Sequence, residues 1–215
     1  MTKKHADKMI PRLPDNPGGR EKVELILACM DELLKTKCAE DISICHLSEM
    51  SGLAAQTIYR IFPSPASVCF TLANRYLGEI CRVQGCAAIY ENCHNWQDAV
   101  EKGLTAMRDY FRQHPQAMAL MFGSGTSREI KAADRNGMRA LVSEVIGFLF
   151  ALRLIPEFPH MMHYSLIALE LNDAVWNLSY DLHRDITDFY LAQGIRAVTA
   201  YAGLYLPVYP TVSAI

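Results

Sequence analysis

The sequence contains no run of about 20 apolar residues, which is the length that a membrane-spanning helix needs. The N-terminal residues, Met1 to His5, are not followed by the apolar stretch of a secretory signal. Charge is also scarce, because 20% of the residues are charged and the net charge is −2. Any affinity for nucleic acid must therefore come from a local basic patch. These absences predict a cytoplasmic protein with no membrane partner.

Paired cysteine motifs are absent, although cysteine itself is not. The chain has seven cysteines, an odd number, and no CxxC motif. We expect reduced, buried thiols that act as small hydrophobic side chains. The alternative is a thiol or metal sensor built on Cys86 and Cys93, seven residues apart on a predicted helix, with His94 adjacent. That spacing is not a usual zinc pattern, so we expect no metal and no cofactor.

Catalytic motifs are missing as well. No nucleophile stands out with a neighbouring base, and no glycine-rich phosphate loop follows a strand. His160, His163 and Glu170 can share one face of a helix, and a solvated polar face explains them. We therefore expect no catalytic residues, and keep an enzyme site in the helical region as an alternative function.

Residues Ser43 to Phe62 have the spacing of a helix-turn-helix, in which the second helix can enter a DNA major groove. Ser43 can cap the first helix, and Gly52 suits a turn position with positive φ. The first helix carries a short apolar stripe at every third residue, formed by Ile44, Leu47 and Met50.

We expect the second helix of this motif to form the surface that contacts DNA. Ile58, Ile61 and Phe62 can face the core, which leaves a polar outer face. On such a face Gln can pair with adenine, Thr can contact a thymine methyl, and Arg can reach guanine or phosphate. The residues expected at the DNA are Ser43, Ala54, Ala55, Gln56, Thr57, Tyr59, Arg60 and Ser64.

These residues resemble the TetR family of one-component repressors. The family pattern appears here as Ser43-Ile44, Leu47-Ser48, Ser51-Gly52-Leu53-Ala54 and Ile58-Tyr59-Arg60-Ile61-Phe62. The resemblance is specific over about residues 20–70 and architectural over the rest. It implies a three-helix DNA reader, a larger helical part that encloses a small-molecule pocket, and pairing of the last two helices with those of a second chain.

Three positions depart from the family pattern. Ala54 stands where a capping Ser is usual. An Ala cannot form the capping hydrogen bond, and its loss costs about 1 kcal/mol of stability. Pro65 stands where a Lys usually approaches a phosphate, and Cys38 stands near the usual Gly of the first turn. These departures predict weaker DNA binding, or phosphate contacts placed elsewhere.

The apolar periodicity predicts an all-α fold of about nine helices, with no alternating strand pattern. The first firm helix, about 20–36, has an apolar face of Val23, Ile26, Leu27, Met30 and Leu34. Ser64 and Pro65 start a long helical region to about 93, with Gly78 and Gly85 as bends or boundaries. Further helices are expected at 95–113, at 118–122, from a capping box at Thr126 and Glu129 to about 152, at 160–183 and at 186–206.

We divide the chain into a flexible basic arm (1–19), a helix-turn-helix domain (20–65), a helical ligand-binding and dimerisation domain (66–207) and a tail (208–215). The arm contains Lys3, Lys4, Lys8 and Arg12 beside several Pro and Gly residues. It is either a solvated tail or an arm that meets phosphates or the minor groove.

The ligand-binding domain is rich in Met and aromatic side chains, which suit an adaptable apolar pocket. They predict an apolar ligand with one polar end. The residues expected to line the pocket are Trp96, Met107, Phe111, Met121, Met138, Phe148, Asp173 and Trp176. Apolar residues also remain for an interface between two chains on the helices at about 160–183 and 186–206, namely Leu166, Leu169, Phe189, Ile195, Val198 and Tyr201.

Together these features predict a homodimeric, ligand-responsive repressor that leaves a palindromic operator when a small apolar effector binds. Three alternatives stay open: an enzyme, a thiol or metal sensor, and a TetR-like binding module with weakened DNA affinity.

Overall fold

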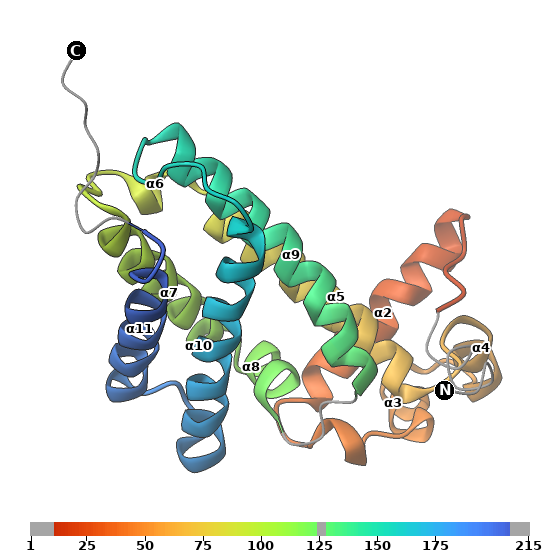
Figure 1. Cartoon of the computed structure of the whole chain (residues 1–215). Helices are drawn as coiled ribbons and strands as arrows, with labels where there is room; N and C mark the ends of the chain where they lie inside the picture. Colours follow the sequence, from red (N-terminus) through yellow and green to blue (C-terminus); the bar gives the residue numbers. More distant parts are fainter. Residues whose placement is uncertain (1–10, 124–127, 207–215) are drawn as a thin grey trace. The chain divides into compact units, whose positions relative to one another are not determined.

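The computed structural model describes residues 11–123 and 128–206, without the side chains of residue 87 and residues 128–137. Within these ranges the chain is helical and contains no strand, so the all-α prediction is confirmed (Figure 1). The elements are α2 (Pro17–Leu33), the 3-10 turn η1 (Ala39–Asp41), α3 (Ile44–Ser51), α4 (Ala55–Ile61), α5 (Pro65–Gln84), α6 (Ala87–Tyr90), α7 (Trp96–Gln113), α8 (Pro115–Phe122), α9 (Arg128–Ala151), α10 (Met161–His183) and α11 (Asp188–Ala202).

Several helix boundaries differ from the predicted ones. α2 begins at Pro17, inside the predicted arm, because the Asn16 side chain accepts a hydrogen bond from the Gly19 N–H at 2.7 Å. α5 continues through Gly78, which is exposed and does not bend it, and ends before Gly85 as predicted. Thr126 of the predicted capping box lies outside the described residues.

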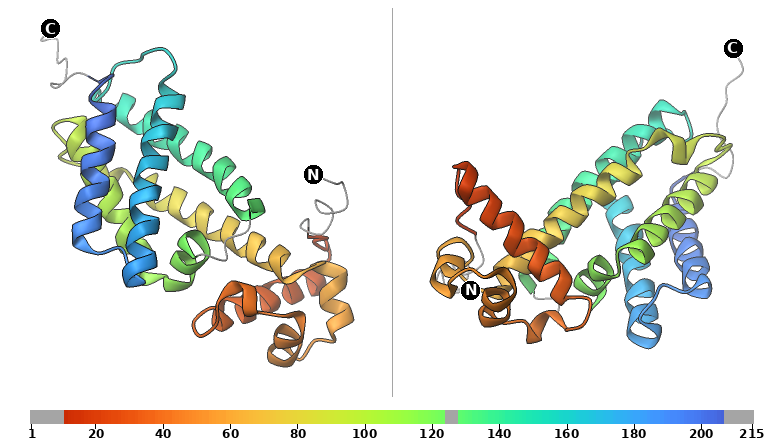
Figure 2. Two further views of the ribbon diagram at one scale, coloured as in Figure 1. Left: turned by 60° about the horizontal axis from the view of Figure 1, so that its bottom comes forward. Right: turned by 180° about the vertical axis from the view of Figure 1, so that it is seen from behind.

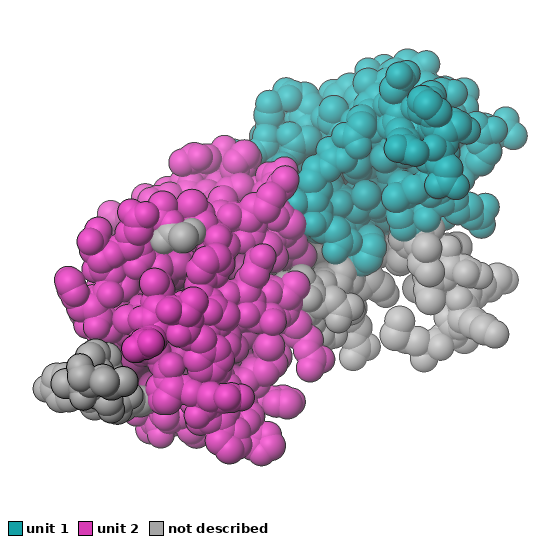
Figure 3. Space-filling view, turned by 90° about the horizontal axis from the view of Figure 1, so that it is seen from above, with its two compact units in different colours: residues 1–76, 115–134 teal, residues 77–114, 135–215 magenta. Residues whose placement is uncertain are grey.

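The chain forms two compact units, which Figure 3 colours separately. Unit 1 comprises residues 1–76 and 115–134, and unit 2 comprises residues 77–114 and 135–215. The long helices α5 and α9 each contribute to both units. The domain boundaries stated above stay a prediction.

Unit 1 is built on the predicted apolar face of α2. All five residues of that face are buried, and they share a core with Ile44, Leu47, Ile58, Phe62, Val68 and Cys69. The thiol of Cys69 contacts the sulfur of Met30 at 3.8 Å, and burial raises its pKa to about 12. At the surface Arg75 of α5 pairs with Glu24 of α2 at 2.7 Å, and the buried Tyr76 of α5 donates to Asp31 of α2. These contacts hold α5 against α2.

Unit 2 is built around α7. α11 packs against both α10 and α7, and α6 packs against α7; α10 and α11 lie side by side in Figures 1 and 2. A cluster at the start of α7 buries Tyr90 and Trp96 against Leu149, Ile155 and Met161. This cluster brings α6, α7, α9 and the start of α10 together.

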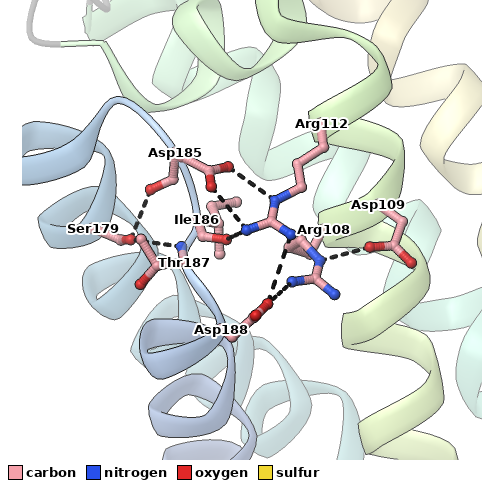
Figure 4. Close-up of polar contacts among 8 residues, drawn as sticks. All are labelled: Arg108, Asp109, Arg112, Ser179, Asp185, Ile186, Thr187 and Asp188. Carbon is pink, nitrogen blue, oxygen red and sulfur yellow. Dashed lines mark hydrogen bonds and ion pairs between the residues drawn. The ribbon is translucent and has the colours of Figure 1, made fainter.

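Two arginines of α7 hold the connection between α10 and α11 (Figure 4). Arg112 donates to both carboxylate oxygens of Asp185, at 3.1 and 2.8 Å, and to the Ile186 carbonyl at 3.0 Å. Arg108 donates to Asp188 at 2.5 Å. Ser179 closes the turn, because its hydroxyl donates to the Asp185 carbonyl and accepts from the Thr187 N–H. The bonds from Arg112 lower the pKa of Asp185 below its ordinary value.

Replacing Asp185 with Asn should cost about 0.5–1 kcal/mol of unfolding free energy at neutral pH, because a half-exposed bidentate pair is screened by solvent. The folded pKa of Asp185 is depressed, so its contribution is present above the unfolded pKa and is lost as pH falls through the folded pKa. The cost should therefore shrink in acid. Urea unfolding at pH 7 and at about pH 3 measures it, and the exposed Asp181→Asn is the control. A cost that is equal at both pH values would contradict this assignment.

Candidate functional site

The residues of unit 1 form a helix-turn-helix from Ser43 to Phe62. Ser43 caps α3 as predicted: its hydroxyl accepts from the His46 N–H, and its own N–H donates to His46 Nδ1, both at 3.3 Å. Ile44 and Leu47 are buried, whereas Met50, predicted on the same stripe, is exposed. α3 ends at residue 51, so the core covers only its first turns.

The turn between α3 and α4 is fixed by a glycine and two serines. Gly52 has φ 70° and ψ 5°, a left-handed conformation that strains residues with a Cβ. The Ser48 hydroxyl donates to the Leu53 carbonyl at 2.6 Å, and the Leu53 N–H donates to the Ser51 hydroxyl at 3.2 Å. These bonds set the direction in which α4 leaves the turn.

Helix α4 has a buried side and an exposed side. Ile58 and Ile61 are buried, as predicted. Gln56, Tyr59 and Arg60, which we call the outer row, are exposed, and Tyr59 keeps 53% of its surface open to solvent. Such a row of polar side chains, held on a rigid helix, can meet base edges and phosphates.

The other predicted DNA contacts lie at the ends of helices. Ala54 precedes α4 and, as expected of Ala, forms no side-chain cap bond. Ala55 and Thr57 are half-buried. Ser64 caps α5, because its hydroxyl accepts from the Ser67 N–H at 3.2 Å. The roles of Ser43 and Ser64 at DNA stay predictions, and both residues have a structural role as caps.

The part of the arm that the structure describes runs beside α4. The backbone N–H of Arg12 donates to the Ile61 carbonyl, the last residue of α4, at 2.7 Å. The Arg12 side chain is exposed there. Lys3, Lys4 and Lys8 lie outside the described residues. The bond places one basic residue of the arm next to the helix that carries the outer row.

Unit 2 contains a cavity of about 160 Å³. Its walls come from α7, α9, α10 and α11 and from the segments that follow α9 and α11, with Gln84 at the end of α5 and Tyr90 at the end of α6. The lining is mainly apolar, and none of the described residues in it is charged. Aromatic residues gather at one part of the wall, where Tyr164 stacks on Tyr205 at 3.8 Å between ring centres and on Phe158 at 6.1 Å.

The eight residues predicted to bind ligand fall in different places. Trp96 and Met107 lie in the cavity wall. The remaining six are not among the residues that line it. The rings of Phe148 and Tyr90 stack with 6.1 Å between their centres, and Phe111 meets Trp176 edge to face with 6.3 Å between ring centres. Trp176 and Met138 are buried, whereas Asp173 is half-buried. Met121 belongs to α8 in unit 1.

A polar corner interrupts the apolar wall, formed by Gln84, Tyr90 and the carbonyl of Gly103. Gln84 Nε2 donates to the Gly103 carbonyl at 2.8 Å, and the Tyr90 hydroxyl donates to Gln84 Oε1 at 3.0 Å. Burial raises the pKa of Tyr90. A Cβ at position 103 would lie 3.1 Å from Gln84 Oε1, so glycine there leaves room for the pair. The Met and aromatic pattern did not predict this corner, because a single Gln gives no periodic signal.

The outer side of α10 carries an apolar stripe, spaced so that its members share one helix face. Its members are all exposed: Ile167, Leu171, Ala174, Leu178 and Leu182. Phe189 of α11 is 64% exposed. Of the residues predicted for a dimer interface, Leu169 and Val198 instead line the cavity, since they lie on the inward faces of α10 and α11.

The residues behind the alternative functions are dispersed. Cys86 and Cys93 do not share a helix, because α5 ends at Gln84 and α6 at Tyr90. Burial raises the pKa of Cys29 and Cys81, which disfavours reactive thiolates. The described residues contain no group of three His, Cys, Asp or Glu side chains placed to hold a metal. His160, His163 and Glu170 are all exposed.

Comparison with known proteins gives one consistent result. No family model matches the sequence, and no curated protein matches it either. Solved structures do match. A TetR-family regulator from Streptomyces coelicolor superposes with a TM-score of 0.62 at 16% identity, over 86% of this chain and 80% of that chain. The chain has the fold of TetR-family transcriptional regulators.

Two further solved structures extend the comparison. A TetR regulator from Rhodococcus sp. RHA1 has a TM-score of 0.58 at 17% identity, over 85% of this chain and 97% of that chain. The fatty acid degradation regulator FadR from Bacillus halodurans has a TM-score of 0.60 at 12% identity, over 90% and 100%. None of the described helices is both long and apolar enough to cross a membrane.

Proposed function

We propose that this chain is a DNA-binding transcriptional regulator whose unit 1 reads an operator through α4. The observation that carries this proposal is the outer row on a short helix whose opposite side is buried. The turn at Gly52 and the cap at Ser43 hold that helix in a defined direction. The TetR-like fold supports the same function.

Phosphate contacts are proposed for the flank of α4. Arg12 is exposed and fixed through its backbone to the end of that helix. The position of the usual phosphate-binding Lys is occupied by Pro65, which has no charge to offer. We infer that Arg12 supplies part of the charge that the family places there, since a protein with a net charge of −2 needs its cations close to DNA.

We further propose that the chain acts as a homodimer through α10 and α11. One α4 helix covers too few base pairs to specify a unique site in a genome. A two-fold dimer doubles the length of the site, with half-sites about one helical turn of DNA apart. The exposed stripe of α10 and the exposed Phe189 provide apolar surface for a self-complementary interface.

The cavity of unit 2 is proposed to bind the effector that releases the operator. A ligand shifts a conformational equilibrium only by its difference in affinity for the two states. A ratio of affinities of about 5–150 corresponds to a coupling free energy of about 1–3 kcal/mol. That is enough to release the operator if the protein binds it only slightly more tightly than occupancy requires. α5 begins directly after the helix-turn-helix and ends at Gln84 in the cavity wall, so it is one of the covalent connections between reader and cavity. We favour a regulator over an enzyme, because the solved structures that match this chain are described as transcriptional regulators.

Replacing Gln56 with Ala should weaken binding to the selected operator by about 1–3 kcal/mol and change the preferred base at one position, because its amide pairs with a base edge. The operator is first selected from a pool of random duplexes, and affinity is then measured by fluorescence anisotropy at fixed salt. Tyr59→Phe is the comparison variant: loss of a phosphate contact should weaken all sequences alike. If Gln56→Ala bound every sequence as well as the parent does, α4 would not be the reading helix.

A further inference from the structure

The polar corner of the cavity has hydrogen-bonding capacity beyond the bonds it already makes. Gln84 and Tyr90 are each only 2% exposed, so both lie in the buried part of the wall. A carboxamide carries two N–H donors and two acceptor lone pairs. The bonds to Gly103 and Tyr90 use one of each. One N–H, one carbonyl lone pair and the lone pairs of the Tyr90 hydroxyl remain for a third group.

That remaining capacity matches a hydroxyl group. A hydroxyl can accept from Gln84 Nε2 while it donates to Gln84 Oε1 or to the Tyr90 oxygen. A buried polar group is stabilised when such bonds are completed, and an apolar ligand would leave them incomplete. The corner therefore favours a ligand with one hydroxyl over a pure hydrocarbon of the same shape.

The charge of the lining excludes another class of ligand. None of the described lining residues is Asp, Glu, Lys or Arg. An ion moved into such a site loses its hydration without gaining a partner of opposite charge. The ligand is therefore neutral, and a carboxylate or an amine in its charged form should be rejected.

The size of the cavity limits the carbon skeleton. The cavity holds about 160 Å³, and an engineered apolar cavity of about 150 Å³ in another protein binds benzene. A single six-membered ring is thus the size of molecule that fits. Ring-stacking partners are at hand, since Trp96, Tyr164 and Phe158 lie in the wall.

We propose that the cavity takes a neutral, single-ring molecule with one hydroxyl group, held at the polar corner by Gln84 and Tyr90. This inference rests on the proposed effector role of the cavity and gives that effector a chemical class. It assigns the polar end of the ligand to Gln84 and Tyr90 instead of to Asp173, the residue predicted from sequence.

The test uses phenol, toluene and benzoate as probes of equal ring size. Their affinities for the full chain, without DNA, are measured by isothermal titration calorimetry and by thermal shift. We expect phenol and toluene to bind and benzoate at neutral pH not to bind. In the double variant Gln84→Met with Tyr90→Phe the corner becomes apolar, so phenol should weaken by about tenfold relative to toluene.

Two further variants make the result specific. Met107→Leu changes another lining residue at similar volume, so it should shift phenol and toluene alike. Tyr90→Phe alone removes one of the two anchoring groups and keeps the Gln84 amide, so it should lower the ratio of phenol to toluene affinity by less than the double variant does. It also tests the proposal if the double variant does not fold, because an unchanged ratio in Tyr90→Phe would show that the Tyr90 hydroxyl does not hold the ligand.

An unchanged ratio in the folded double variant, binding of benzoate to the parent, or no binding of phenol would each overturn the inference. The proposed regulator function is tested separately, by operator binding in the same preparations. Suppose that another compound releases the operator, while the ratio of phenol to toluene affinity is the same in the double variant as in the parent. The inference about the ligand class then fails, and the proposed regulator function stands. If the probes behave as expected but no DNA is bound, the function fails and the assignment of ligand class stands.

Discussion

Replacing Leu178 with Asp is expected to convert the proposed dimer into a monomer at micromolar concentration. Leu178 lies near the middle of the stripe on α10 and is 51% exposed in the single chain. In a two-fold interface each chain presents the same residue, so two carboxylates would enter one apolar contact. Burying such charges without partners costs several kcal/mol, which is enough to abolish a micromolar dimer.

The measurement is sedimentation equilibrium, together with operator affinity. The monomer should keep its helical circular dichroism and lose most of its operator affinity, because each chain then holds one half-site alone. Leu152→Asp is the matched control, since Leu152 is a similarly exposed leucine that follows α9 and belongs to neither α10 nor α11. A Leu178→Asp protein that stays dimeric would place the interface elsewhere.

Replacing Gly194 with Ala is expected to lower the unfolding free energy by about 2–3 kcal/mol, because it overpacks the contact between α10 and α11. A Cβ at position 194 would lie 2.3 Å from Asn172 Oδ1 and 3.0 Å from Trp176 Nε1. Asn172 is fully buried, and its amide atoms find no hydrogen-bond partner among the described residues. The added methyl group would push the two helices apart.

Thermal and urea unfolding measure this effect, and two variants isolate its cause. Gly78→Ala adds the same methyl group within α5, where no atom lies within 4 Å, and should stabilise by about 0.5–1 kcal/mol through helix propensity. Asn172→Ala combined with Gly194→Ala should recover part of the loss, because the clashing amide is gone. A Gly194→Ala protein as stable as Gly78→Ala would mean that the helices do not approach closely at that position.

The sequence predicted the helix-turn-helix in detail because its signals are local. Ser43, Gly52 and the buried Ile58 act within a few residues of their own positions, through a cap, a left-handed turn and helix periodicity. The all-α architecture followed from the same periodicity. Gly78 shows the limit of such signals. It was predicted as a bend or boundary, but α5 continues through it, because a single glycine does not by itself end a helix.

The cavity was harder to predict because its lining depends on which helix covers which face. Met107 lines the cavity, whereas Phe111, one turn further along α7, packs against Trp176. Both are apolar, buried and on the same side of the helix, and only the placement of α10 separates them. Gln84 was not predicted as a pocket residue, because its role depends on hydrogen bonds with Tyr90 and Gly103 that the sequence alone does not reveal.

The division of α4 into a buried and an exposed side also bears on how such a protein can change over generations. Ile58 and Ile61 contribute to folding, whereas the outer row is exposed and supplies no core packing. Surface substitutions of this kind usually alter stability by less than about 0.5 kcal/mol. Mutation can therefore sample new side chains at positions 56, 59 and 60 with little risk of unfolding. Duplicated copies of the gene could therefore diverge in the operator that we propose α4 reads, while keeping the same core.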